Sequence, residues 1–204
     1  MFDIICVTNR SICVGDFLSR IEKIADCRVQ GIILREKDLN EKDYALLAQK
    51  TLKICEEHKV KCILHTFYKS AAKLGAASVH LPLPVLRGMT DADKESFKII
   101  GASCHSTDDA VEAQRLGCSY ITAGHIFETD CKKGLMGRGT DFLHAVCKSV
   151  NIPVYAIGGI CEKNAASVID AGAAGICVMS GAMTCADPKE YFKNLGRSGE
   201  KNEF

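Results

Sequence analysis

Short apolar runs rich in isoleucine, valine, leucine and cysteine recur along the whole chain. Within each run the apolar residues are continuous rather than alternating, which is typical of parallel strands that are buried on both faces. Segments with helical spacing separate most of the runs; in residues 44–55, for example, apolar side chains recur every three or four positions. The runs predict eight strands, at residues 3–8, 30–35, 61–65, 77–81, 98–103, 118–123, 152–157 and 174–179.

Strand and helix alternate eight times within 204 residues, and this order predicts a single-domain α/β fold, the (β/α)8 TIM barrel. An open, doubly wound parallel sheet is the alternative fold. Glycine follows the helical pattern at residues 75, 117 and 172, where helices commonly end in a left-handed conformation. We expect the barrel to occupy residues 1–195 and the polar, glycine-bearing residues 196–204 to form a flexible C-terminal tail.

Charge and composition exclude several classes of partner. The chain carries 26 Lys and Arg against 25 Asp and Glu without long runs of either sign, so we expect no binding to nucleic acid or to a membrane. No apolar stretch approaches membrane-spanning length and no leader pattern precedes the first predicted strand, which predicts a cytoplasmic protein. The 12 cysteines are scattered through apolar runs without a C-x-x-C pair, as expected for buried side chains in a reducing compartment rather than for a zinc site.

The carboxyl ends of the predicted strands carry the candidate chemistry, because barrels of this kind place their active sites there. His125 is the leading candidate, since it follows an apolar strand and opens a loop that contains Thr129 and Lys132. A hydrogen-bonded loop histidine is the plain alternative, but the polar residues around this strand end favour a catalytic role. Structural and supporting roles are equally well founded for the other strand-end histidines, His65, His80 and His105.

Carboxylates are scarce at these strand ends, and the third and fourth strands contribute none. Enzymes usually hold Mg²⁺ through one or two carboxylates together with substrate phosphates. We therefore expect no metal ion, and we favour proton transfer by an imidazole.

Two glycine-bearing strand ends predict a phosphate site. Gly158 and Gly159 follow the seventh strand, and Met179 and Ser180 follow the eighth, which are the usual phosphate-binding positions of this fold. The plain alternative is that both segments are tight turns. Arg35, at the end of the second strand, either holds a substrate carboxylate through a bidentate contact or belongs to a solvated charged loop.

In these regions the sequence resembles the thiamine phosphate synthase superfamily, and the resemblance covers nearly the whole chain. Within that superfamily it resembles the TenI branch, whose characterised members are thiazole tautomerases. The distinctive match is the loop Gly124–Leu135 followed by Gly137–Gly139, because synthases usually carry proline where His125 stands. The other matching segments, in chain order, are Leu34–Lys37, Gly101–Ser106, Ala156–Ile160 and Val178–Ser180.

The chain departs from the synthase pattern at three places. Synthases have a Gln two residues before the Arg of the second strand, an Asn-Asp pair that ends the third strand, and a Gln-x-Asp segment after the fourth strand for the pyrimidine diphosphate and Mg²⁺. This chain has Ile33, His65–Thr66 and Leu83–Val85 instead. Without a metal clamp, synthase chemistry would lose its main electrostatic stabilisation, so these departures favour the tautomerase.

The resemblance thus implies an isomerase, a thiazole tautomerase of thiamine biosynthesis. It would convert 2-(2-carboxy-4-methylthiazol-5(2H)-ylidene)ethyl phosphate into the aromatic 2-(2-carboxy-4-methylthiazol-5-yl)ethyl phosphate, with His125 transferring the proton. Arg35 would contact the substrate carboxylate, and Ser103 is a weaker candidate for orienting the site. The implied phosphate contacts are Gly158, Gly159, Met179 and Ser180, and the implied thiazole contacts are Thr129, Asp130, Cys131 and Lys132.

Three other functions remain open. A thiamine phosphate synthase with relocated metal ligands would couple a pyrimidine diphosphate to a thiazole phosphate with Mg²⁺. A noncatalytic regulatory barrel would keep the phosphate site without needing an imidazole at position 125. A different phosphate-binding isomerase on the same barrel is the third. We further expect a small-molecule thiazole phosphate as substrate, no cofactor, and assembly as a homo-oligomer, a dimer.

Overall fold

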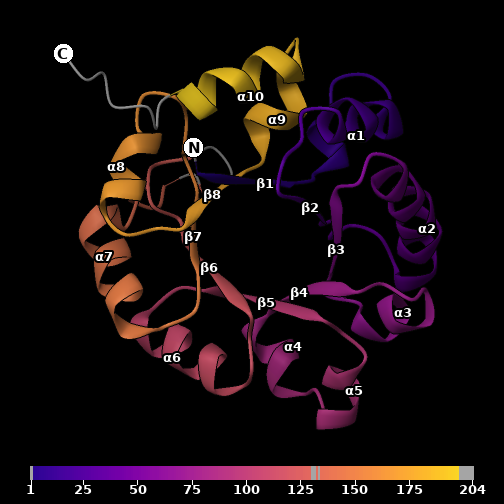
Figure 1. Cartoon of the computed structure of the whole chain (residues 1–204), viewed down its shortest axis with the longest axis horizontal. Helices are drawn as coiled ribbons and strands as arrows, with labels where there is room; N and C mark the ends of the chain where they lie inside the picture. Colours follow the sequence, from indigo (N-terminus) through magenta and orange to yellow (C-terminus); the bar gives the residue numbers. More distant parts are fainter. Residues whose placement is uncertain (1, 130–131, 133, 198–204) are drawn as a thin grey trace.

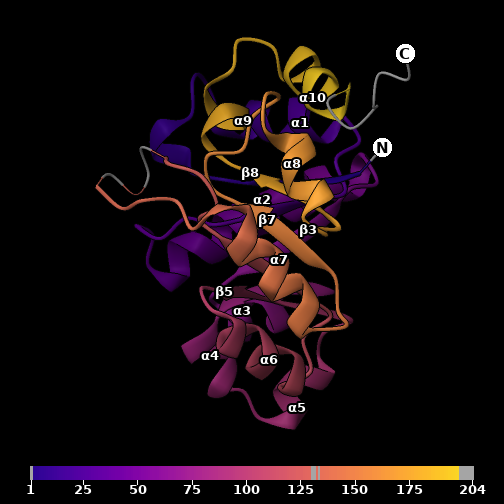
Figure 2. The same cartoon turned by 90° about the vertical axis from the view of Figure 1, so that its left-hand side faces the viewer.

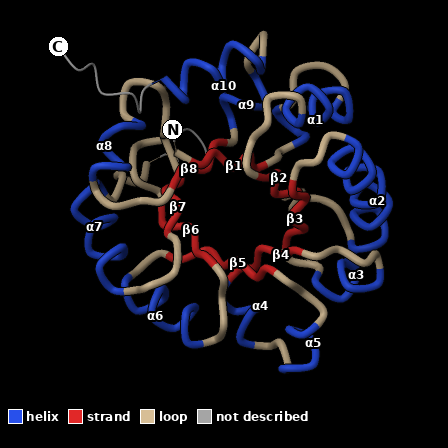
Figure 3. The backbone as a smooth tube through the Cα atoms, viewed as in Figure 1, coloured by secondary structure: helices blue, strands red, loops and turns tan. Residues whose placement is uncertain are grey.

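The computed structural model describes residues 2–129, 132 and 134–197. Eight parallel strands close into a barrel in chain order, and the last strand pairs with the first. Helices surround the barrel on its outer side (Figures 1 and 3). The strands are β1 (Asp3–Val7), β2 (Gly31–Leu34), β3 (Lys61–His65), β4 (Ser78–Pro82), β5 (Ile99–Cys104), β6 (Tyr120–Gly124), β7 (Val154–Ile157) and β8 (Gly175–Val178).

Every connection from one strand to the next contains at least one helix. The β4–β5 connection holds two short helices, and two further helices follow β8. The helical elements are η1 (Arg10–Ile12, a 3-10 turn), α1 (Phe17–Ala25), α2 (Glu41–Glu57), α3 (Tyr68–Lys73), α4 (Leu83–Arg87), α5 (Asp91–Glu95), α6 (Thr107–Arg115), α7 (Gly139–Ser149), α8 (Ala165–Asp170), α9 (Ser180–Thr184) and α10 (Pro188–Arg197).

Successive residues of a strand face two different apolar layers. In β1, Ile5 and Val7 belong to the cluster inside the barrel, whereas Cys6 belongs to the layer between the strands and the helices. Helix α2 adds the buried side chains of Tyr44 and Ala48 to that outer layer, from the helical stripe predicted over residues 44–55. The strands are therefore covered on both faces, which explains their continuous apolar sequences.

The predicted (β/α)8 barrel is confirmed, and each predicted strand matches the observed one to within two residues at either end. The periodicity does not reveal α4 and α5, because five residues make less than two helical turns. Helix α10 continues through Arg197, so it enters the segment expected as a tail, and residues 198–204 lie outside the described residues.

Left-handed glycines end three of the helical segments as predicted. The φ angles of Gly75, Gly117 and Gly172 are 71°, 91° and 102°. They follow α3, α6 and α8, and after each of these helices the chain turns back toward the next strand. Within the part of the chain that the structure describes, no helix has the length and apolar character needed to cross a membrane.

Candidate active site

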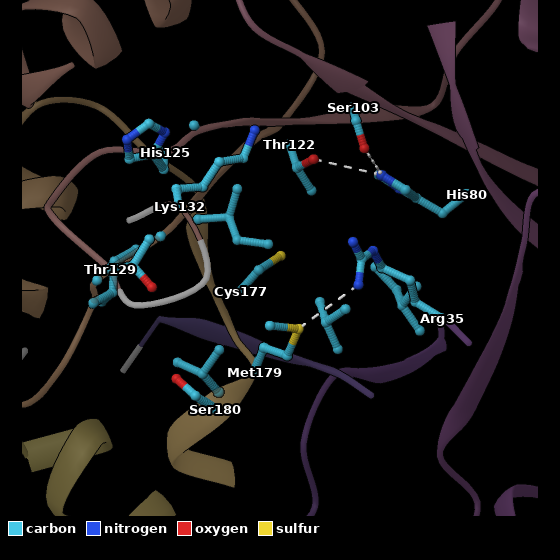
Figure 4. Close-up of a pocket in the computed structure, with 18 of the residues that line it drawn as sticks. Arg35, His80, Ser103, Thr122, His125, Thr129, Lys132, Cys177, Met179 and Ser180 are labelled. Atoms are coloured by element: carbon cyan, nitrogen blue, oxygen red, sulfur yellow. Dashed lines mark hydrogen bonds between the residues drawn. The ribbon is translucent and has the colours of Figure 1, made fainter. Parts of the chain in front are cut away.

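A cavity of about 280 Å³ opens at the carboxyl ends of the strands (Figure 4), and a wider hollow of about 750 Å³ adjoins it. Two of the predicted site residues, Asp130 and Cys131, lie outside the described residues. The other nine all line this cavity: Arg35, Ser103, His125, Thr129, Lys132, Gly158, Gly159, Met179 and Ser180. The sequence therefore located the cavity correctly, while the role of each residue stays a prediction.

The floor of the cavity is a polar layer made by the inward-facing residues of β4, β5 and β6. His80 Nε2 lies 2.9 Å from the Ser103 hydroxyl and 3.4 Å from the Thr122 hydroxyl (Figure 4). Its Nδ1 lies 3.0 Å from the Tyr120 hydroxyl, deeper in the barrel. Gly101 makes room for the Tyr120 ring, since a Cβ at this glycine would lie 2.2 Å from Tyr120 Cζ.

Burial keeps two histidines of this site neutral. Burial, with a smaller effect of the Arg35 charge, lowers the pKa of His80 to about 3. Burial again, followed by the proximity of His80 and Arg35, lowers the pKa of His65 to about 2. The two rings stack with their centroids 5.8 Å apart. At neutral pH each imidazole therefore offers one hydrogen-bond donor and one acceptor but no charge.

The end of β3 is held in an unusual conformation. Thr66 has a φ of 67°, a left-handed value that is unfavourable for a β-branched residue, and its hydroxyl lies 2.6 Å from His65 Nδ1. The Tyr44 hydroxyl accepts a hydrogen bond from the His65 N–H at 2.7 Å and donates one to the Leu34 carbonyl at 2.7 Å. This bridge ties the end of β3 to the end of β2, so the surroundings maintain the strained turn.

One side of the cavity is cationic. Arg35 extends from the end of β2 with Nη1 3.9 Å from Met179 Sδ (Figure 4), and Lys37 and Lys132 also line the cavity. The Arg35 charge, followed by burial and the Lys132 charge, lowers the pKa of the Lys37 amine. No carboxylate of the described residues lines this cavity. An anionic ligand would therefore relieve the mutual repulsion of these cations.

The nearest carboxylates of the β2–α2 loop serve the loop itself. Glu36 is buried, and it accepts hydrogen bonds from the Thr8 hydroxyl at 2.5 Å and from the Arg10 N–H at 2.9 Å. The same Thr8 hydroxyl accepts a hydrogen bond from the Arg35 N–H at 2.9 Å. Asp38 pairs with the guanidinium of Arg10. These contacts turn both acidic groups away from the cavity and fix the backbone of Arg35.

Glycines let the β7–α8 turn approach the loop after β6. Gly158 and Gly159 have φ angles of 104° and 66°. A Cβ on Gly158 would lie 2.3 Å from His125 Cβ, and a Cβ on Gly159 would lie 2.3 Å from the Glu128 carbonyl oxygen. Among the described residues, no acceptor pairs with the N–H groups of Gly159 and Ile160. This turn can therefore donate backbone hydrogen bonds to an anion in the cavity.

His125 belongs to the wall of the cavity rather than to its floor. Its Nε2 lies 3.3 Å from the Leu135 carbonyl, and its own carbonyl accepts a hydrogen bond from the Arg138 N–H at 3.0 Å. The Phe127 N–H donates to the Gly158 carbonyl at 3.0 Å, which fastens the start of the β6–α7 loop to β7. Figure 2 shows this loop reaching outward beyond the neighbouring connections.

Several cavity residues lie outside the predicted site, among them Lys37, Thr122 and Tyr191. Lys37 was noted in the charged β2–α2 loop but was given no role, although it lies only two residues beyond Arg35. Thr122 stands within an apolar strand, and only the inward position that it shares with Tyr120 could have revealed it. Tyr191 belongs to α10 and packs against the backbone of Gly181, a contact that no local sequence signal indicates.

The metal that synthase chemistry implies does not fit these residues. At the positions of the synthase carboxylates, Thr66 carries a hydroxyl that lies 2.6 Å from His65 Nδ1, and Val85 is a partly buried apolar side chain of α4. Mg²⁺ prefers oxygen ligands with at least one carboxylate. Among the described residues, no cluster of three His, Cys, Asp or Glu side chains could hold a metal ion. The described residues at these positions therefore do not form a metal site.

A comparison with known families decides the relationship of this chain. A family model described as thiamine monophosphate synthase matches residues 4–182, which include all eight strands except the first residue of β1. The chain belongs to the thiamine monophosphate synthase family. Family membership confirms the predicted superfamily, and it makes the protein an enzyme of thiamine biosynthesis.

Individual members of this family are similar over almost their full length. The thiamine-phosphate synthase of Clostridium acetobutylicum is 33% identical over 200 residues, covering 96% of this chain and 94% of its own. That of Methanobrevibacter smithii is 34% identical over 194 residues, covering 93% and 91%. Among solved structures, thiamine phosphate pyrophosphorylase from Pyrococcus furiosus superposes with a TM-score of 0.83 at 27% identity, covering 98% of this chain and 96% of that one.

These relatives contradict the predicted thiazole tautomerase. They are named as synthases, which are transferases, so the isomerase class is wrong and the TenI branch is not supported. The prediction depended on His125 in one loop and on the missing carboxylates, whereas the identity to the synthases extends over the whole barrel. The proton transfer assigned to His125 falls with that reaction.

Proposed function

We propose that this protein is a thiamine-phosphate synthase, a transferase that joins a pyrimidine diphosphate to a thiazole phosphate. The observation that carries the proposal is that one cavity combines two anion-binding regions, the backbone turns after β7 and β8 and the cationic side that includes Arg35 and Lys132. A monophosphate and a diphosphate that react with each other need two such regions, whereas isomerisation of one monophosphate needs only one. The names of the relatives support the same reaction.

The thiazole phosphate would bind through the backbone after β7 and β8. The N–H groups of Gly159 and Ile160 lack protein acceptors among the described residues, and Met179 and Ser180 line the adjacent edge of the cavity. This arrangement would fix the phosphate without a charged side chain. His125 and Thr129 would then form the wall beside the thiazole ring.

The pyrimidine diphosphate would lie against the cationic side, near Arg35, Lys37 and Lys132. Ser103 would add a neutral contact, because His80 Nε2 at 2.9 Å fixes the direction of its hydroxyl. Since the pKa of His80 is lowered to about 3 by burial, this dyad stays uncharged at the pH of the cell. Its hydrogen bonds would orient the substrate without competing for the anion.

A coupling assay with paired glycine variants tests this proposal. Purified protein receives both substrates, and thiamine phosphate is measured by chromatography with either substrate omitted as the blank. We expect product from the wild type and a loss of at least about 100-fold in kcat/KM for Gly159→Ala, because the new methyl group would collide with the Glu128 carbonyl and displace the phosphate turn.

The matched control is Gly75→Ala. Gly75 also has a positive φ, but a Cβ there meets no atom within 4 Å, and the residue lies beyond α3, away from the cavity. We expect this variant to lose about 1 kcal/mol of stability and to keep its kcat/KM. Absence of product from correctly folded wild type would refute the proposed function.

A further inference from the structure

The residues at the end of β3 differ in chemistry from those of the synthase pattern. Where synthases carry an Asn-Asp pair for the metal, this chain carries His65–Thr66. Burial lowers the pKa of His65 to about 2, so its imidazole is neutral, and its Nδ1 lies 2.6 Å from the Thr66 hydroxyl. Its Nε2 has no hydrogen-bond partner within the described residues, and the residue lines the cavity. In the tautomer whose Nδ1 accepts from the Thr66 hydroxyl, Nε2 carries the hydrogen and can donate to an anion.

Positive charge at the cavity comes from side chains instead of a metal. Arg35, Lys37 and Lys132 all line the cavity. In Figure 4, Arg35 and Lys132 reach toward the cavity from different sides. Three cations around one anion supply the electrostatic stabilisation that a divalent metal would otherwise provide.

We infer that the coupling proceeds without a divalent metal ion, and that the neutral donor of His65 joins Arg35, Lys37 and Lys132 at the leaving diphosphate in its place. This inference rests on the proposed function. In the step itself, the C–O bond between the pyrimidine methylene carbon and the diphosphate breaks, and its electron pair leaves with the diphosphate. The lone pair of the thiazole nitrogen forms the new C–N bond, which leaves a positively charged thiazolium product.

Binding of inorganic diphosphate in EDTA tests the site independently of turnover. Isothermal titration calorimetry should show one site for the wild type, with an affinity that falls as salt increases. We expect Lys37→Gln and Lys132→Gln each to weaken the affinity about tenfold or more, because each removes a charge-assisted hydrogen bond. Lys53→Gln is the control, since this exposed lysine pairs with Glu57 on α2 and does not line the cavity.

Coupling rates with EDTA and with Mg²⁺ complete the test. Rates that agree within about twofold support the inference. A strict requirement for Mg²⁺ overturns the inference but leaves the proposed function intact. Absence of coupling under both conditions, together with metal-free diphosphate binding that Lys37→Gln and Lys132→Gln weaken, supports the anion site and refutes the proposed function.

A pair of reversal variants provides a second readout. His65→Asn with Thr66→Asp restores the synthase residues, and Asp tolerates the left-handed φ at position 66 better than Thr does. We expect this variant to respond to Mg²⁺ with a rate increase of about tenfold or more. The uncharged match, His65→Asn with Thr66→Asn, should not respond. An equal response in both variants would contradict the assignment of the metal requirement to this position.

Discussion

Gly101 on β5 faces the ring of Tyr120 on β6, and this contact supports the floor of the active site. The Tyr120 ring also packs edge-on against Tyr155, with centroids 5.6 Å apart, so it has little freedom to move. Its hydroxyl lies 3.0 Å from His80 Nδ1, and His80 in turn holds the Ser103 hydroxyl. The absence of a Cβ at Gly101 is therefore needed to orient the Ser103 hydroxyl in the cavity.

Substituting Gly101 with alanine should destabilise the protein by about 1–3 kcal/mol, because the added Cβ would lie 2.2 Å from Tyr120 Cζ and overpack the barrel interior. Gly88→Ala is the matched control. Its φ is −83°, and a Cβ there would lie 3.5 Å from the Val85 carbonyl, which is an ordinary contact. We expect that control to be neutral or stabilising by less than about 1 kcal/mol in urea unfolding. Equal effects of the two substitutions would contradict this account.

Some residues of the site were predictable from sequence because the end of an apolar run marks the end of a strand. Gly158 and Gly159 directly follow an apolar run, and Arg35 does the same on β2. The neutrality of His80 was not predictable, since it depends on partners from β5 and β6 that surround the ring. The tautomerase reaction assigned to His125 was wrong, whereas its place in the cavity was predicted correctly and its role stays a prediction.

At the scale of elements, one tyrosine of α2 connects two strand ends. The hydroxyl of Tyr44 lies between β2 and β3, at hydrogen-bonding distance from the Leu34 carbonyl and the His65 N–H. The regular β2–β3 pairing ends at Leu34 and Leu64, so this hydroxyl continues the connection beyond the last strand pair. The helix therefore fixes the relative position of the segments that carry Arg35 and His65.

Removing that hydroxyl should cost more than its small volume suggests. We expect Tyr44→Phe to lower the free energy of unfolding by about 1–3 kcal/mol, because it leaves a buried N–H and a buried carbonyl without their partner. Tyr68→Phe serves as the control, since the Tyr68 hydroxyl makes no hydrogen bond within the described residues. A change of less than about 0.5 kcal/mol is expected there. Chemical denaturation with matched buffers measures both, and similar values for the two variants would be evidence against the bridge.

The strands were the most predictable elements of the chain. Burial on both faces gives them continuous apolar sequences, which stand out against helices with one polar side. Short elements such as α4 and α5 lack enough turns to show a period, and their place in the fold follows from packing against the barrel. Helix α10 brings Tyr191 to the cavity from near the end of the chain, and this contact depends on closure of the whole barrel.

At the scale of the whole molecule, the barrel interior makes stability depend on pH. An unfolded histidine has a pKa near 6.5, whereas burial lowers the pKa of His80 to about 3 and that of His65 to about 2. Between these values the unfolded chain binds more protons than the folded chain, so a falling pH favours unfolding. The contribution of these two neutral histidines to stability is fully present above about pH 6.5 and is lost as the pH falls toward their folded pKa values.

Each of these histidines should therefore lower the free energy of unfolding by about 1.4 kcal/mol for every unit that the pH falls well below 6.5. We expect His80→Gln to reduce the pH dependence of the unfolding free energy by about that amount per unit between about pH 5 and about pH 6. Any loss that the variant shows at about pH 8 reports packing rather than titration. Urea unfolding across this range provides the measurement, and an unchanged slope in the variant would show that His80 does not titrate in this way.

The sequence alone was sufficient for the architecture and the family but not for the reaction. Apolar runs that alternate with helical segments predict a barrel, and the ends of its strands locate the cavity. The choice between tautomerase and synthase rested on a few strand-end residues, while the similarity to named synthases spans 96% of the chain. The homodimer, the absence of a cofactor and the cytoplasmic location stay predictions.

The stoichiometry of coupling tests the proposed synthase activity. Wild-type protein is incubated with thiazole phosphate and pyrimidine diphosphate, and mass spectrometry follows both substrates, the C–N coupled product and free diphosphate. We expect one diphosphate to be released for each thiamine phosphate formed, with equal consumption of the two substrates. Release of diphosphate with unchanged thiazole phosphate, or no consumption of either substrate by folded protein, would contradict it.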